Sequence, residues 1–302
     1  MDSSRPLPTS VIWSSEVSAK LNDNADCRGL GQALPLSVAI ITKDEEANLP
    51  RLFDSLERLE PAEVIVVDSG STDSTVAIAR DYGAQVIETD WPGHVEQKNR
   101  ALSACHQPWV LSLDADEPIS PELADNLRDL LAKNNAPQRN GYEISRLTYY
   151  LGDWLRHVWY PEWRLRLVRR GMAKWTGYNP HDRLEVEGAT GRIDGDIHHY
   201  SYTGVEDHFR RSIDYAKIGA EALSARGKPF RWHKMIFSPL ARFIRLLIFR
   251  QGWRDGWRGW IIAWSSMFSG FLKYAFLYEM QRQQRKFGTG TNGTTDRDGS
   301  HG

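Results

Sequence analysis

Short apolar runs alternate with segments of helical periodicity between residues 36 and 132, and this alternation restricts the chain to few folds. The runs are too short for helices and are rich in β-branched residues, so we expect buried strands. Four such runs are present: Leu36–Ile41, Val64–Val67, Ala84–Glu88 and Trp109–Leu113. Strands that alternate with helices favour a mostly parallel sheet with helices on both faces. The sequence therefore predicts an α/β fold.

Acidic side chains follow two of these predicted strands. Asp68 comes directly after Val64–Val67, and Asp114 and Asp116 come directly after Trp109–Leu113. The carboxyl ends of parallel strands are where open α/β sheets bind ligands. Two carboxylates that are two residues apart on an extended segment point to the same side and suit a hard dication. We predict that Asp114 and Asp116 bind Mg²⁺ or Mn²⁺; a polar turn would leave the same pattern.

Asp68 is placed to read the base of a nucleotide. Its carboxylate can accept the imide N–H of uracil, and Gly70 lets the backbone approach a nucleoside closely. The alternative is that Asp68 only caps the helix that follows. A base-binding group on one strand and a cation site on another are what a nucleotide-sugar transferase requires.

Composition limits the remaining possibilities. The net charge of -1 provides no general field for nucleic acid, so we expect no nucleic-acid partner. Cys27 and Cys105 lack metal-ligand or redox spacing, which fits a reducing compartment. Residues 142–202 are rich in Trp, Arg, Tyr and His, and we expect short strands and loops over the open edge of the sheet. The predicted divisions are a flexible extension at 1–33, the α/β domain at 34–203, a helical membrane-associating region at 204–284 and a disordered tail at 285–302.

The helical region carries aromatic side chains on a basic background. Asp255 is the only acidic residue between Arg226 and Trp260. Basic helices with interfacial tryptophan typically lie on anionic membranes. The alternative is that the aromatic stripe packs in the core or at a dimer contact. No uncharged run reaches the roughly 18 residues of a spanning helix, so we expect peripheral attachment. Two stripes at helical spacing support amphipathic helices: Trp253, Trp257, Trp260 and Trp264, and the small residues Gly252, Gly256, Gly259 and Ala263.

Two of the predicted strand segments resemble the family 2 glycosyltransferases, which have the GT-A fold, a Rossmann-like arrangement. The run Ile65–Asp73 resembles their first nucleotide-binding element. Leu36–Leu49 looks like their opening strand, with Asp44 where the family usually has Asn. In the family this strand end lines the uridine pocket. The resemblance therefore implies that Thr42 and Glu45 contact the donor.

A helical segment further along the chain extends this resemblance. Gln97–Ala101 resembles the family's next element, which implies that Lys98 and Asn99 lie beside the nucleotide. A lysine there can meet the diphosphate as a point charge. With Asp114 these residues complete the predicted donor site. An exposed helix surface would explain the same segment from composition alone.

The second half of the chain resembles one branch of that family. The segment Trp154–Trp175 looks like the lipopolysaccharide core glucosyltransferases of the WaaE and KdtX type. That branch has a His-Glu pair whose carboxylate is the expected catalytic base, and His181-Asp182 stands in its place here. The resemblance implies that Asp182 is the base, with Glu185 a less favoured substitute.

Two further groups in this half are candidate ligands. His198 and His199 precede a Tyr-Ser-Tyr sequence that matches the branch, and His199 is a candidate third metal ligand or phosphate contact. A structural histidine is the alternative. Arg164, Arg166 and Trp159 are candidate acceptor contacts, because arginine binds phosphate well. The arginines can equally form the solvated face of a strand.

These features together predict an enzyme. We expect inverting transfer of a hexose, with glucose favoured, from a UDP-sugar to a hydroxyl of a lipid-linked saccharide such as the lipopolysaccharide inner core. The expected location is the cytoplasm, at the inner face of the bacterial cytoplasmic membrane. Transfer to a polyprenyl phosphate or another surface glycan is the first alternative, and a non-catalytic membrane-associated scaffold is the second.

Overall fold

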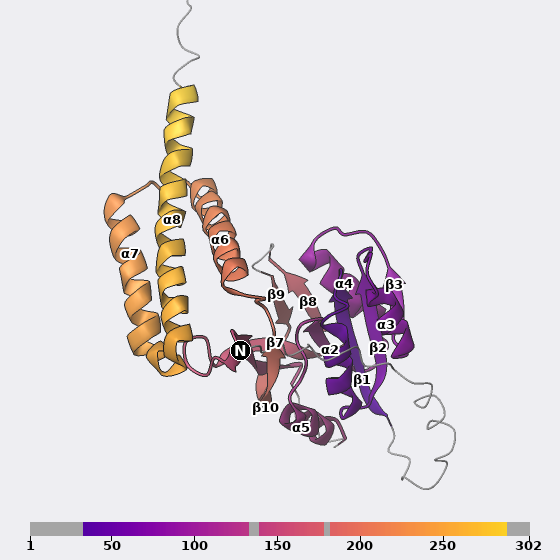
Figure 1. The fold of residues 1–302 in the computed structure, drawn as a ribbon. Helices are drawn as coiled ribbons and strands as arrows, with labels where there is room; N and C mark the ends of the chain where they lie inside the picture. The colour runs from indigo at the N-terminus through magenta and orange to yellow at the C-terminus, as the bar shows by residue number, and fades with distance from the viewer. Residues whose placement is uncertain (1–32, 133–138, 178–181, 289–302) are drawn as a thin grey trace, which may run out of the picture. The chain divides into compact units, whose positions relative to one another are not determined.

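A computed structural model describes residues 33–132, 139–177 and 182–288 (Figure 1). Nearly all of the predicted extension, most of the predicted tail, Cys27 and His181 lie outside the described residues. The elements in chain order are β1 (Leu34–Thr42), α2 (Leu49–Glu57), β2 (Pro61–Asp68), α3 (Thr75–Asp81), β3 (Gln85–Glu88), α4 (His94–Ala104), β4 (Trp109–Asp114), α5 (Pro121–Ala132), β5 (Gly141–Tyr150), β6 (Asp153–Trp154), β7 (Glu162–Arg169), β8 (Ala173–Thr176), β9 (Arg183–Val186), β10 (Thr190–His199), α6 (Val205–Ala225), α7 (Trp232–Ile244), the π-helix η1 (Arg245–Phe249), the 3-10 turn η2 (Gly252–Asp255) and α8 (Gly256–Gly288).

An eight-stranded mixed sheet organises the first two thirds of the described chain. The strand order is β10-β5-β7-β4-β1-β2-β3, with β6 paired to β5. Strands β4, β1, β2 and β3 run parallel, and β10 is parallel to β5. β7 is antiparallel to both of its neighbours, β4 and β5. The prediction of an α/β fold with a mostly parallel sheet is confirmed.

Helices cover both faces of this sheet. On one face α2, α3 and α5 pack on buried strand residues such as Val38, Ile40 and Leu111. On the other face α4 and the β8–β9 hairpin pack on Ala39 and Val67. Successive side chains of β1 point to opposite faces, and both faces are covered. This double burial explains why the strand reads as a continuous apolar run.

The expectation of short strands and loops in residues 142–202 holds for β6, β8 and β9 but is wrong for the three long strands. β5 and β10 are each ten residues long, β7 is eight, and all three extend the main sheet instead of lying over its edge. Charged side chains in this region suggested exposed loops, but some of them are buried in pairs. Arg166, for example, is 4% exposed because it pairs with Glu117 and Asp114.

The C-terminal helices pack side by side, with α8 against both α6 and α7 (Figure 1). Trp257 and Trp260 lie on α8 and are about half exposed, whereas Trp253 belongs to the separate turn η2. The prediction that the tryptophans share one helix is therefore wrong for Trp253. Gly256 adopts a φ of +63° between the two elements, which glycine permits at little cost. No helix among the described residues has a segment long and apolar enough to cross a bilayer.

Candidate active site

Three parallel strands bring the predicted donor residues to one edge of the sheet. In the β1–β2 pair Thr42 lies opposite Asp68, and in the β1–β4 pair Ile41 lies opposite Asp114. The carboxyl ends of β2 and β4 therefore flank the end of β1. Asp68 and Asp114 lie on either side of the last residues of that strand.

Asp68 is buried, and its carboxylate is fully used by neighbouring groups. Oδ1 accepts hydrogen bonds from Thr42 Oγ1 at 2.9 Å and Ser71 Oγ at 2.5 Å. Oδ2 accepts the backbone N–H groups of Gly70 at 2.9 Å and Ser71 at 2.8 Å. A carboxylate has about four acceptor positions, so a uracil N–H would have to replace one of these donors. Asp68 thus shapes its loop, in which Gly70 has a φ of +76°, and the uracil contact stays a prediction.

The loop after β1 is joined to the loop after β2. The backbone N–H groups of residues 44–46 donate in turn to side-chain oxygens of Ser71, Thr75 and Asp73. In return the Asp44 carboxylate accepts a backbone N–H from the second loop. These reciprocal bonds fix the two strand-end loops as one unit beside the site. Asp44 has the role of a loop clamp in this structure.

Lys98 joins two carboxylates that are far apart in the sequence. Its Nζ lies 2.9 Å from Asp114 Oδ1 and 2.8 Å from Asp182 Oδ2. The ammonium group also lies 4.3 Å from the ring centroid of Trp175. Burial raises the pKa of Asp114, but Lys98 and Arg166 together outweigh burial and hold that pKa well below its usual range. Asp182, the predicted base, and Asp114, a predicted donor ligand, therefore share the ammonium group of Lys98.

Buried charges continue from Asp114 into the sheet. Arg166 Nη2 lies 2.6 Å from Glu117 Oε1 and 3.3 Å from Asp114 Oδ2. Arg146 contacts the same Glu117 oxygen at 3.3 Å and Glu162 at 2.7 Å. Nε and Nη1 of Arg166 are buried and have no hydrogen-bond partner among the described residues. Buried donors of this kind normally find a partner, and an anionic ligand would supply one.

Asp116 and His199 face each other beside this network. His199 Nε2 lies 3.5 Å from Asp116 Oδ2. Burial raises the pKa of Asp116 to about 7, and the carboxylates of Glu117 and Asp114 act in the same direction. Burial and the charge of Arg146 hold the pKa of His199 well below its usual value, so its imidazole is neutral. The Nδ1 atom of His199 has no hydrogen-bond partner among the described residues.

This pair suits a divalent cation that binds together with a substrate. A cation would relieve the repulsion among the carboxylates, and a neutral imidazole is a common metal ligand. Nowhere among the described residues, however, do three His, Cys, Asp or Glu side chains gather closely enough to hold a metal ion. Mg²⁺ is commonly held by one or two carboxylates plus substrate phosphates. The residues present therefore fit a metal that requires the donor's diphosphate.

The remaining predicted residues have other partners. Asn99 exchanges two hydrogen bonds of 2.9 Å with the backbone of Trp175, which ties the β8–β9 hairpin to α4. Arg164 is exposed and forms an ion pair within its own strand. Trp159 packs against Tyr202, with ring centroids 5.9 Å apart. The donor role of Asn99 and the acceptor roles of Arg164 and Trp159 stay predictions.

Two further titratable residues flank the site. His94, which the sequence analysis missed, lies one helical turn before Lys98 on α4. Burial and Lys98 lower its pKa, while Asp182 and Asp114 act in the opposite direction, so all three charged groups are close to it. The four-residue spacing from Lys98 was the signal available in the sequence. Glu45 is half-buried, and burial raises its pKa, with a smaller contribution from Asp114.

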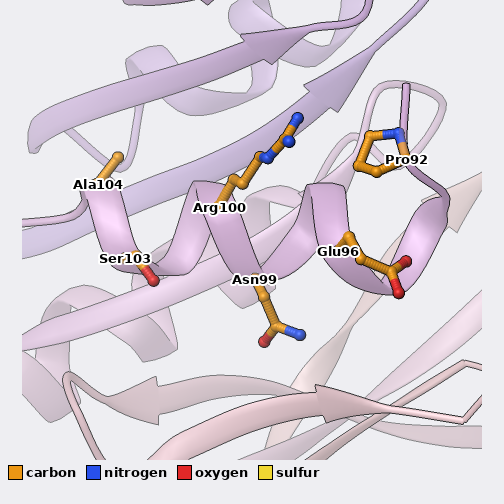
Figure 2. Close-up of a pocket in the computed structure, with 6 residues that line it drawn as sticks. All are labelled: Pro92, Glu96, Asn99, Arg100, Ser103 and Ala104. Atoms are coloured by element: carbon orange, nitrogen blue, oxygen red, sulfur yellow. The ribbon is translucent and has the colours of Figure 1, made fainter. Parts of the chain in front are cut away.

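A hollow of about 660 Å³ lies along α4, away from the carboxylates (Figure 2). Its lining residues are Pro92, Glu96, Asn99, Arg100, Ser103 and Ala104. Figure 2 shows Asn99 and Arg100 pointing away from α4 in opposite directions. The hollow contains none of the buried charges described above, so the sheet edge is the better candidate for chemistry.

Comparison with known proteins identifies the family. The model of the family described as Glycosyl transferase family 2 matches residues 37–184, from β1 into β9. Lipopolysaccharide core biosynthesis glycosyltransferase LpsC of Rhizobium meliloti (strain 1021) is 35% identical over 259 residues, which are 82% of this chain and 93% of LpsC. An uncharacterized glycosyltransferase of Rickettsia typhi is 32% identical over 260 residues, which are 83% of this chain and 89% of the relative. The chain belongs to glycosyl transferase family 2, and the resemblance seen in its sequence is confirmed.

One solved structure that the chain matches is glucosyl-3-phosphoglycerate synthase from Mycobacterium tuberculosis in complex with Mn²⁺, uridine-diphosphate and glucosyl-3-phosphoglycerate. It is 20% identical, covers 65% of this chain and 81% of its own, and has a TM-score of 0.42. At this TM-score the likeness assigns neither a donor nor a metal to the present chain.

Proposed function

We propose that this glycosyltransferase moves a hexose, glucose in the first instance, from a UDP-sugar to a hydroxyl of a lipid-linked saccharide such as the lipopolysaccharide inner core. The observation that carries the proposal is the pairing of Asp114 and Asp182 on Lys98 Nζ, at 2.9 and 2.8 Å. This pairing puts a strand-end carboxylate beside a second carboxylate that can act as a base. The name of LpsC, a lipopolysaccharide core biosynthesis glycosyltransferase, supports the acceptor class.

In the proposed reaction the acceptor's hydroxyl oxygen attacks the anomeric carbon of the donor, and the bond from that carbon to the diphosphate breaks. Asp182 accepts the hydroxyl proton. Lys98 and the buried N–H groups of Arg166 balance the negative charge on the departing UDP. When Lys98 pairs with the diphosphate, Asp182 loses its ammonium partner and is free to take the proton. A single displacement inverts the anomeric centre.

We propose that Mg²⁺ or Mn²⁺ binds with the donor, held by Asp116, His199 and the diphosphate, while Asp114 stays paired with Arg166. The cation, when bound, neutralises charge on the leaving diphosphate. The pKa of about 7 at Asp116 and the neutral imidazole of His199 support this assignment. An imidazole ligand favours Mn²⁺, because Mg²⁺ prefers oxygen ligands.

We propose that the enzyme lies at the inner face of the bacterial cytoplasmic membrane and attaches through α7, η1, η2 and α8. Large apolar side chains are exposed along these elements, with Phe249 at 75% and Trp232 at 64%. Arg242, Arg245 and Arg254 are exposed among them. Exposed aromatic and basic side chains together match an anionic lipid surface.

A donor screen tests the proposed reaction. The purified protein is incubated with UDP-, GDP- and dTDP-sugars and Mn²⁺, and slow hydrolysis of the donor is measured. We expect turnover of UDP-glucose that stops when a chelator removes the metal. Preference for a GDP-sugar would overturn the choice of donor. Failure to bind any nucleotide would support the scaffold alternative.

A further inference from the structure

Asp255, the single acidic residue of the basic segment, is buried where the C-terminal helices meet the sheet. Its side chain is 3% exposed. The carboxylate accepts the backbone N–H groups of Arg156, His157 and Val158 at 3.0, 3.1 and 2.8 Å. Nδ1 of His157 lies 2.8 Å from the same carboxylate. Charge-assisted hydrogen bonds are strong and directional, so Asp255 holds the turn before α8 firmly against residues 156–158.

The segment that Asp255 holds leads directly into the site. Residues 151–161 connect β5 to β7, and these strands carry Arg146 and Arg166 of the buried charge network. Arg258 of α8 donates a hydrogen bond of 2.9 Å to the backbone oxygen of Leu151 in the same segment. A buried apolar cluster fills the joint between sheet and helices: Tyr150, Leu155, Val158 and Ile262.

Large apolar side chains are exposed in η1 and on both sides of Asp255 in the sequence. Ile248 and Phe249 in η1 are 59% and 75% exposed, and Trp253 and Trp257 on either side of Asp255 are 57% and 55% exposed. The proposed lipid-facing surface therefore comes within two residues of the carboxylate that grips the β5–β7 segment. A path from the exposed tryptophans to Arg146 and Arg166 therefore runs through Asp255 and the β5–β7 segment that it binds.

We propose that Asp255 is a positioning residue, which fixes the angle between the lipid-facing helices and the sheet so that a membrane-held acceptor reaches Asp182. This inference rests on the proposed function. An acceptor confined to the bilayer can meet the base only if the sheet is held at the correct angle above the lipid surface. A water-soluble acceptor arrives by diffusion and does not depend on that angle.

The test compares one enzyme on two forms of one acceptor. The Asp255→Asn variant keeps a side chain of the same shape but replaces one acceptor oxygen with an N–H donor. Glu279→Gln removes the same charge from an exposed position of α8 and is the matched control. Transfer from UDP-glucose is measured to lipid-linked core saccharide in phosphatidylglycerol-containing vesicles and to the saccharide released from it by mild acid. Vesicle binding is measured by sedimentation.

We expect Asp255→Asn to lose at least about tenfold in transfer to the vesicle-held acceptor while it keeps transfer to the released saccharide, donor hydrolysis and vesicle binding within about twofold. The control should match the wild type in all four measurements. A purely structural role would lower both transfer rates by the same factor, and that result, or no loss with either acceptor, would overturn the proposal. His157→Ala, which removes one of the contacts, should give a smaller loss in the same direction.

An orientation measurement separates this inference from the proposed reaction. A fluorophore is attached at Gln85→Cys in a Cys27→Ser background. Gln85 lies on β3, the last strand of the sheet at the end away from β10. Cys105 is buried, and burial raises the pKa of its thiol to about 12, so it reacts slowly with the label. Energy transfer to a dye in the bilayer should show one distance for the wild type and a broader spread for Asp255→Asn. If the wild type transfers sugar to neither acceptor, the proposed function fails. If the distance distribution of Asp255→Asn equals that of the wild type, the positioning role of Asp255 is overturned, whatever the transfer rates are.

Discussion

At the scale of single residues, Lys98 determines how the site is assembled. It compensates two partly buried carboxylates at 2.8 and 2.9 Å, and neither Asp114 nor Asp182 has to carry an unpaired charge in the free enzyme. The arrival of a diphosphate would compete for the same ammonium group. In the proposed reaction, donor binding and activation of Asp182 would be coupled through this one side chain.

Replacing Asp182 with Asn should lower transfer to a hydroxyl acceptor by at least about 100-fold, because an amide cannot accept the proton. UDP affinity, measured by calorimetry, should not fall and should rise modestly, since the diphosphate no longer competes with the Asp182 carboxylate for Lys98. Glu185→Gln, in the neighbouring strand β9, is the control and should retain near wild-type rates. Full activity of the Asp182 variant would instead favour an acceptor that is already a phosphate, such as a polyprenyl phosphate, which needs no base.

Asp116 provides a prediction in which stability and function change in opposite directions. Its pKa of about 7 lies above the ordinary value of 3.8, so the folded protein holds this proton more tightly than the unfolded chain does. The stabilisation is complete below the ordinary pKa and is lost as the pH rises through about 7. Asp116→Asn should therefore be about 1–2 kcal/mol more stable than the metal-free wild type at pH 8 and nearly equal to it at pH 4.

The same variant should lose metal-dependent UDP binding. Metal binding needs the deprotonated carboxylate, so affinity of the wild type for Mn²⁺ with UDP should fall about tenfold per pH unit below about 7. Calorimetric titrations at several pH values measure this slope, and denaturant unfolding measures the stability. A pH-independent metal affinity, or a destabilised Asp116 variant at pH 8, would contradict the assignment.

At the scale of elements, two glycines of α8 have opposite surroundings. A Cβ atom at Gly259 would lie 1.8 Å from the backbone oxygen of Gly252 in η2, whereas a Cβ atom at Gly270 would meet Pro239 of α7 no closer than 3.4 Å. The first position allows η2 and α8 to touch, and the second leaves room for a methyl group.

Gly259→Ala should therefore lower the free energy of unfolding by about 2–3 kcal/mol, because the backbone must move to relieve the overlap. Gly270→Ala should change stability by less than about 1 kcal/mol and can increase it, since alanine favours helix more than glycine does. Chemical denaturation of both variants is the measurement. Equal effects at the two positions would refute the close contact between η2 and α8.

A strand could be predicted from the sequence when it carries no buried charged side chain, and it was difficult to predict when its buried charges pair with residues far away in the chain. β1, β2 and β4 are buried on both faces and lack buried charges until their last residues, so their apolar runs identify them directly. β5 and β7 carry Arg146 and Arg166, whose partner Glu117 lies 29 and 49 residues away in the sequence. A single sequence does not display such pairs, so the local pattern of this region predicts only short strands and loops.

The same reasoning applies to the site. Strand-end carboxylates follow from the local pattern, and the structure places Asp68 and Asp114 at one sheet edge as that pattern requires. The sharing of Lys98 by Asp114 and Asp182 depends on a contact across 84 residues. Only the resemblance to a family suggests that Asp182 belongs near the donor residues. The four-residue spacing from Lys98 is the one local signal for His94, and no local pattern indicates Arg146.

At the scale of the whole molecule, the apolar surface of the C-terminal helices has to be covered. Its exposed side chains lie on elements that also carry exposed arginines, and no described helix can span a bilayer. Large exposed apolar patches mark interaction sites. The exposed basic residues favour the proposed lipid surface over a second copy of the chain, because two copies of a basic surface repel each other.

Replacing Trp253, Trp257 and Trp260 together with Ser should reduce binding to phosphatidylglycerol-containing vesicles at least about tenfold, because interfacial tryptophans supply much of the apolar contact. Trp91→Ser removes an exposed tryptophan elsewhere, at 40% exposure, and should bind like the wild type. Sedimentation with anionic and neutral vesicles at two salt concentrations is the measurement. Unchanged vesicle binding with a shift from dimer to monomer in light scattering would identify the surface as a dimer contact instead.

The parallel pairing of β10 with β5 has a consequence for the order in which the protein folds. Thr190 pairs with Gly141, so a long crossover must close before β10 can join the sheet, and such non-local pairing forms slowly. His199 lies at the end of β10, whereas Asp116 follows β4 and leaves the ribosome much earlier. The Asp116 part of the proposed metal site is thus synthesised first, and the site would stay incomplete until β10 joins the sheet. Binding of UDP with Mn²⁺ should accordingly appear only in the final phase of refolding, which makes the nucleotide a reporter of completed folding.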